Sequence, residues 1–177
     1  VEVLERHGDH QGLNLTTAVR DGIVGHTGAT IPVTLEGQII RIVDRIAYLC
    51  HDFDDAQRAG MLTAEALPFE VREHFGMTPS SMITAMVEDM VRESLDKPAI
   101  SMSADVEMTM NLFRQFMFKH VYLAPALIPD RKKASHVVKN LFTHFMEHPD
   151  DMEGCETGKA FYSTRDVVAV SYTHLTL

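Results

Sequence analysis

The feature that most constrains the fold is a helical spacing of apolar residues along nearly the whole chain. It is clearest in residues 34–58. Apolar side chains recur there three and four positions apart, at Leu35, Ile39, Ile42, Val43, Ile46, Ala47, Leu49 and Cys50. This spacing predicts one long amphipathic helix, with Thr34 as its N-cap and Gly60 as its stop.

The same spacing predicts further helices on both sides. A short helix is expected to start at a cap, Thr16 or Thr17, and to end near Gly25, before a connector at residues 28–32. Later helices are expected at residues 68–75, from Pro79 onward, at 104–122, at 130–147 and from about Thr157. No run of four or more residues alternates with period two strongly enough to predict a strand. We therefore predict an all-α protein of about seven helices, without internal repeats.

Composition narrows the class of protein. A hydrophobic fraction of 45% with 7 Pro and 10 Gly is typical of a globular domain and excludes collagen-like and disordered chains. The net charge of −9 argues against a general nucleic-acid binder, so an anionic ligand needs a few placed cations. Two cysteines without a CxxC pair, no apolar run long enough to span a membrane and no export signal make the cytoplasm the expected location.

One segment, RIVDRIAYLCHDFDD at residues 41–55, combines carboxylates, a phenol and guanidinium groups. On a helix, Asp44, Tyr48, Asp52 and Asp55 fall on one stripe, with Arg41 and Arg45 beside it. Carboxylates hold hard cations, and arginine binds phosphate with two hydrogen bonds. The alternative is an ordinary solvated helix face with i,i+4 ion pairs, which composition alone favours.

A second polar stripe lies in the segment MNLFRQFMFKHVYLAP. Arg114, Phe118 and Tyr122 are spaced i, i+4 and i+8, which places the arginine and the tyrosine two turns apart on the same side. Alone, this pattern is as typical of surface side chains as of a binding site.

The histidines carry little specific signal. His144 and His148 have the i,i+4 spacing of metal ligands, but surface histidines without a ligand are more common. The sequence contains no HExxH, no Glu-x-x-His, no Walker loop, no GxGxxG and no GxSxG. Phosphate chemistry would therefore depend on side chains and a metal.

Two segments, GLNLTTAVRDGIVGH and TLEGQIIRIVDRIAYLCHDFDDAQRAG, closely resemble bacterial deoxyguanosine triphosphate triphosphohydrolase-like proteins of the HD-domain superfamily. The resemblance continues through SMITAMVEDMVRES and LFRQFMFKHVY to about Ala169. It implies an incomplete HD-type helical bundle from a hydrolase that splits a deoxynucleoside triphosphate into deoxynucleoside and triphosphate.

The resemblance also implies a divalent metal, Mg²⁺ or Mn²⁺, held by a histidine, a His-Asp pair and a later aspartate. Asp44 matches that last aspartate. The other ligands and the catalytic histidine are expected upstream of Val1, so no catalytic residue is assigned here. His51-Asp52 looks like the signature pair, but its place after Asp44 matches a different element, and His51 is not assigned to the metal.

Five positions match substrate-contacting residues of the family. Arg45 matches a residue that contacts the triphosphate, Tyr48 a tyrosine over the phosphates and sugar, and Asp52 an acceptor for the sugar 3′-hydroxyl. Arg114 and Tyr122 match residues that line the nucleotide pocket from a facing helix. The family also implies a homo-oligomer without membrane attachment; a nucleic-acid effector remains open but is not indicated.

The expected organisation has three parts. Residues 1–122 are the C-terminal part of the HD catalytic core, residues 123–169 a C-terminal helical region of the same domain, and residues 170–177 a tail that resembles a translated sequencing adapter. Two alternatives to a triphosphohydrolase fragment remain. One is a helical nucleotide-binding or oligomerisation module without catalysis, and the other is an HD phosphohydrolase that acts on cyclic nucleotides.

Overall fold

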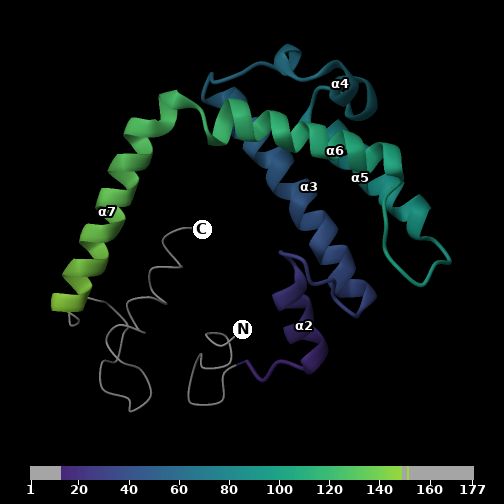
Figure 1. Cartoon of the computed structure of the whole chain (residues 1–177), viewed down its shortest axis with the longest axis horizontal. Coiled ribbons are helices and arrows are strands. Elements are labelled where there is room, and N and C mark those ends of the chain that lie inside the picture. Colours follow the sequence, from purple (N-terminus) through teal and green to yellow (C-terminus); the bar gives the residue numbers. More distant parts are fainter. Residues whose placement is uncertain (1–12, 149–150, 152–177) are drawn as a thin grey trace. The chain divides into compact units, whose positions relative to one another are not determined.

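A computed structural model describes residues 13–148 and 151, and every regular element in these residues is a helix (Figure 1). The all-α prediction is therefore confirmed. The chain divides into two compact units, residues 1–124 and residues 125–177, and each is described by itself. The helix expected from Thr157 and the tail at residues 170–177 lie outside the described residues.

The first unit contains α2 (Thr17–Gly25), α3 (Leu35–Arg58), η1 (Ala64–Ala66), α4 (Phe69–Phe75), α5 (Pro79–Ser94), α6 (Ala104–Met117) and the π-helical turn η2 (Phe118–Tyr122). The second contains η3 (Pro125–Leu127) and α7 (Ile128–Glu147). None of the helices in the described part of the chain is long and apolar enough to cross a membrane.

The predicted caps of the first two helices are confirmed. The Thr16 hydroxyl accepts from the Val19 backbone N–H at 3.3 Å, and the Thr34 hydroxyl accepts from that of Gly37 at 3.2 Å. Gly60, with φ of +67°, follows the end of α3, a backbone conformation that glycine adopts at low cost. One expected helix differs from the prediction, because residues 104–122 are α-helical only to Met117 and continue as η2.

The core of the first unit forms around α3, which packs against α2, α5 and α6, while α4 packs against α5 and α6. Phe53 of α3 and Phe113 of α6 are fully buried and meet edge to face, with ring centroids 5.8 Å apart. Leu49 of α3 and the buried methionines of α5 and α6 fill the remaining space. Methionine often fills irregular gaps in protein cores.

Two side chains of α3 hold the loops at its N-terminal end. The Arg41 guanidinium donates to the carbonyl oxygens of Gly25, Gly28 and Thr30 at 2.5 to 3.0 Å. The Gln38 amide donates to the carbonyl of Pro32 and accepts from the backbone N–H of Ile100, both at 3.0 Å. The loop before α6 is therefore attached to α3.

The start of α6 has a second attachment. Asp89 of α5 is only 4% exposed, and its carboxylate accepts from the backbone N–H of Ser103 at 2.8 Å. Ser103 is the N-cap of α6 and accepts in turn from Val106. A buried carboxylate needs such a donor, so this contact places the first turn of α6 against α5.

The two glycines where α2 crosses α3 allow the helices to approach closely. A Cβ on Gly37 would lie 2.6 Å from the Cβ of Pro32 and 3.3 Å from the Cα of Gly22. A Cβ on Gly22 would meet the Cα of Gly37 at 3.6 Å, an ordinary contact distance. Of these two residues, Gly37 is the one that is required to be glycine for steric reasons.

This asymmetry predicts opposite effects of the same substitution. Gly37→Ala should lower the free energy of unfolding by about 1–3 kcal/mol, because Pro32 cannot move aside without shifting the connector. Gly22→Ala should be neutral or raise it by up to about 1 kcal/mol, since alanine is the better helix former. Urea unfolding followed by circular dichroism measures both, and equal losses in the two variants would contradict the steric assignment.

Candidate functional site

Three polar side chains of the predicted stripes meet in the first unit. Tyr48 and Asp52 lie one turn apart on α3, and Tyr122 comes from η2. The Tyr122 hydroxyl donates a hydrogen bond to the Asp52 carboxylate. All three side chains are partly buried, so the contact is partly shielded from water.

The surroundings of Tyr122 keep its phenol protonated. Burial raises the pKa of Tyr122, and the hydrogen bond to Asp52, the charge of Asp52 and the nearby Tyr48 raise it further. The phenol is therefore a hydrogen-bond donor at every physiological pH. A carboxylate has about four acceptor positions, so Asp52 can accept from Tyr122 and still accept from a ligand.

The π-helical turn determines the side from which Tyr122 reaches α3. In a regular α-helix, eight residues exceed two full turns by about 80°, so the i, i+8 spacing alone would place Tyr122 only loosely on the side that carries Arg114. In the structure, the Leu123 N–H donates to the carbonyl of Phe118 at 2.9 Å, the i→i−5 bond of a wider turn. The wider turn rotates Tyr122 back toward the side that carries Arg114.

Arg114 connects to this group through an aromatic ring. Its guanidinium carbon lies 5.3 Å from the centroid of the Phe118 ring, a cation–π distance. The Phe118 ring meets the Tyr122 ring edge to face, with centroids 5.0 Å apart. The two residues predicted for one side of this helix are therefore linked by the residue between them.

Arg45 lines a cavity at the N-terminal half of α3. This cavity, of 340 Å³, lies between α3, the connector at residues 29–31 and the loop at residues 100–102, with Glu107 of α6 also in its lining. The Nε of Arg45 is buried and has no hydrogen-bond partner among the described residues. An unpaired buried guanidinium N–H is costly, so the Nε is a donor that still needs a partner.

Asp44 is exposed on α3, one residue before Arg45. No three His, Cys, Asp or Glu side chains come together as a metal site within residues 13–148 and 151. His144 and His148 of α7 have ring centroids 4.9 Å apart, and the Nε2 of His144 lies 2.8 Å from Asp151. The described residues therefore do not form a complete metal centre, and Asp44 is one exposed carboxylate among them.

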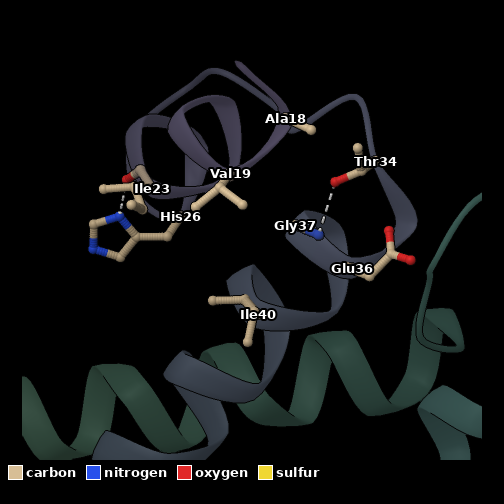
Figure 2. Close-up of a pocket in the computed structure, with 9 residues that line it drawn as sticks. Ala18, Val19, Ile23, His26, Thr34, Glu36, Gly37 and Ile40 are labelled. Atoms are coloured by element: carbon tan, nitrogen blue, oxygen red, sulfur yellow. Dashed lines mark hydrogen bonds between the residues drawn. The ribbon is translucent and has the colours of Figure 1, made fainter. Parts of the chain in front are cut away.

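A further cavity, of 550 Å³, lies between α2 and the start of α3 (Figure 2). Val19 and Ile23 of α2 and Ile40 of α3 give it an apolar lining. His26 also lines this cavity, and its Nδ1 lies 2.5 Å from the carbonyl oxygen of Ile23. This cavity shares no residue with the polar group at Asp52, and its polar lining consists of His26, Thr34 and Glu36.

Sequence spacing identified Tyr48, Asp52, Arg114 and Tyr122 as members of two stripes, and the structure joins these stripes. Arg45 lies in the lining of the cavity beside the connector and the loop at residues 100–102. Arg41, expected beside the stripe, is occupied by three backbone carbonyls. Gln38 was not identified, because its partner Ile100 is distant in the sequence and no local pattern marks the contact.

Comparison with known proteins gives two results. The family described as "Phosphohydrolase-associated domain" matches residues 100–165, which include α6, η2 and α7. Proteins named "Deoxyguanosinetriphosphate triphosphohydrolase-like protein" are similar over most of the chain: one from Caldanaerobacter subterraneus is 41% identical over 86% of this chain, and one from Clostridium perfringens 35% identical over 84%. The chain spans 44% and 46% of the length of these two relatives.

The raised pKa of Tyr122 predicts how stability changes with pH. The phenol of the unfolded chain ionises near pH 10, whereas the folded state resists ionisation. The stabilisation is therefore complete below about pH 10 and is lost as the pH rises toward the raised value. Tyr122→Phe should flatten this alkaline decline and cost about 1–2 kcal/mol near neutral pH, because Asp52 loses a donor.

Urea unfolding from about pH 8 to pH 11 checks this expectation. Burial also raises the pKa of the Cys50 thiol, to about 12. Wild type and Tyr122→Phe both keep Cys50, so its contribution to the pH dependence of stability is the same in the two proteins. The same alkaline slope in wild type and Tyr122→Phe would mean that Tyr122 ionises normally.

Proposed function

We propose that the chain is the nucleotide-binding part of a deoxynucleoside triphosphate triphosphohydrolase, because it is similar over most of its length to deoxyguanosinetriphosphate triphosphohydrolase-like proteins and matches the phosphohydrolase-associated family. The proposed reaction releases inorganic triphosphate from dGTP or a related nucleotide. In the proposed longer protein, this segment holds the sugar and the phosphates.

The observation that carries the proposal is the meeting of Asp52 and Tyr122, 70 residues apart in the sequence. Asp52 is proposed to accept a hydrogen bond from the sugar 3′-hydroxyl beside the phenol of Tyr122. Tyr48, one turn away, is proposed to lie over the sugar and phosphates. A carboxylate and two phenols side by side suit a hydroxyl-bearing sugar better than a bare phosphate, which a carboxylate repels.

The phosphates are assigned to the two arginines. Arg45 follows Asp44 on α3, one turn before Tyr48, and its buried Nε lacks a partner among the described residues. Arg114 has a guanidinium supported by the Phe118 ring. Guanidinium groups bind phosphate oxygens with paired, charge-assisted hydrogen bonds, so these two cations would offset the net charge of −9 locally.

Asp44 is proposed as one ligand of a divalent metal, Mg²⁺ or Mn²⁺. The described residues do not complete that site, so the remaining ligands and the catalytic residue are expected in the part of the longer protein outside this chain. The roles proposed above for Asp52, Tyr48 and Tyr122 do not depend on the metal. A homo-oligomer in the cytoplasm is part of the same proposal.

A second candidate is a nucleotide-binding or oligomerisation module without catalysis of its own. Its supporting observation is that the described residues supply one candidate metal ligand and no complete site. The two candidates agree on nucleotide binding and differ in turnover. They therefore require separate experiments.

The first experiment measures dGTP binding to this chain by calorimetry. Asp52→Asn should weaken binding about tenfold, because the amide is a weaker acceptor and does not orient the Tyr122 phenol as the carboxylate does. Asp54→Asn is the matched control, since Asp54 lies on the same helix and pairs with the exposed Arg58 at 2.7 Å. No binding by wild type, or equal losses in both variants, would contradict the proposed site.

The second experiment measures triphosphate release from dGTP by the longer protein, with Mg²⁺ or Mn²⁺. Asp44→Ala should lower kcat/KM at least about a hundredfold, because loss of a metal ligand removes both affinity and charge stabilisation. Asp54→Ala is the control, because Asp54 lies on the same helix outside this stripe and pairs with the exposed Arg58. Wild-type turnover in Asp44→Ala would refute the ligand assignment, and binding without turnover in the wild type would favour the non-catalytic module.

A further inference from the structure

The Phe118 ring occupies an unusual place between two polar-tipped side chains. It is the first residue of η2, and 41% of it is exposed. Phe113, five residues earlier, is fully buried against Phe53. The surroundings of Phe118 therefore suggest a role other than filling the core.

Its contacts are with the two residues proposed to line the nucleotide site from this helix. The Arg114 guanidinium lies over its face, 5.3 Å from the centroid, and the Tyr122 ring meets it at 5.0 Å with an interplanar angle of 75°. An aromatic face attracts a cation, and edge-to-face pairs are the favoured aromatic geometry. One ring thus restrains two neighbours.

We propose that Phe118 is a positioning residue that holds the Arg114 guanidinium and the Tyr122 phenol in one arrangement. Its consequence for nucleotide binding rests on the proposed function, but the positioning itself does not. The π-helical turn supplies the geometry, because it rotates Tyr122 back to the side that Arg114 and Phe118 share. The ring then limits the rotamers of both side chains.

Without the ring, each neighbour changes in a defined way. The long Arg114 side chain regains rotamers that a ligand would have to restrict again on binding. The Tyr122 ring loses an apolar neighbour, so water reaches the phenol and the pKa of Tyr122 moves back toward its ordinary value. Leucine keeps an apolar side chain but has no aromatic face, whereas tyrosine keeps both the ring and its contacts.

The test compares Phe118→Leu with Phe118→Tyr. Phe69→Leu is the matched control, because Phe69 is 62% exposed at the start of α4. The readouts are the pH titration of the Tyr122 ring-carbon signal in ¹³C-tyrosine-labelled protein and the position of the Arg114 side-chain signals. The chain has 4 tyrosines, and Tyr122→Phe and Arg114→Lys identify the two sets of signals.

In wild type, the Arg114 protons should resonate upfield under the aromatic ring, and Tyr122 should titrate above an ordinary tyrosine. Phe118→Leu should remove the upfield shift and lower the Tyr122 midpoint, Phe118→Tyr should retain both, and Phe69→Leu should change neither. Arg114 signals at ordinary positions in wild type would overturn the proposal without any variant. So would a Tyr122 midpoint unchanged in Phe118→Leu, or changes of equal size in Phe118→Leu and Phe118→Tyr.

Calorimetry with dGTP adds the functional consequence. Phe118→Leu should weaken dGTP binding about two- to fivefold, the range expected for one exposed cation–π contact. Phe118→Tyr should bind dGTP as wild type does. If wild type binds no dGTP, the proposed function fails while the spectra still decide the positioning role. If wild type binds and Phe118→Leu binds equally well with unchanged spectra, the positioning role fails and the proposed function stands.

Discussion

The apolar face of α3 has to be buried, and the rest of the first unit follows from how that burial is achieved. Only helices from elsewhere in the chain can cover this face, and α2, α5 and α6 do so. Because Phe53 and Leu49 point into the core, Asp52 and Tyr48 on the neighbouring side are left at its edge, partly buried. The position of the polar stripe is thus a consequence of packing.

Partial burial gives the polar group its chemistry. A fully exposed Asp52 would be hydrated and would hold a partner weakly, whereas a fully buried one would need all its acceptor positions filled. At the edge of the core, it binds Tyr122 and keeps capacity for another donor. The same setting raises the pKa of Tyr122, so the phenol of Tyr122 stays a neutral donor beside the Asp52 carboxylate that accepts from it. Such an asymmetric pair can orient a hydroxyl group.

Much of the fold was predictable because the information is local. Thr16 and Thr34 are caps that the first turn of each helix needs, and the three- and four-residue spacing of apolar side chains marks α3 without reference to any partner. The replacement of the last α-turn by η2 was not predicted, since it depends on how Tyr122 and Val121 settle against α3 and the core. The Gln38 contact to Ile100 was missed for a similar reason.

By itself, the sequence determined the helices, their caps and the two polar stripes, because these depend on residues within one or two turns of each other. Only the tertiary structure decided which members of the stripes meet. It joined Asp52 to Tyr122, placed Phe118 between Tyr122 and Arg114, placed Arg45 beside the loop at residues 100–102 and committed Arg41 to backbone carbonyls. These contacts depend on how the helices are rotated about their axes and how α6 ends, and both are set by core packing across distant parts of the chain.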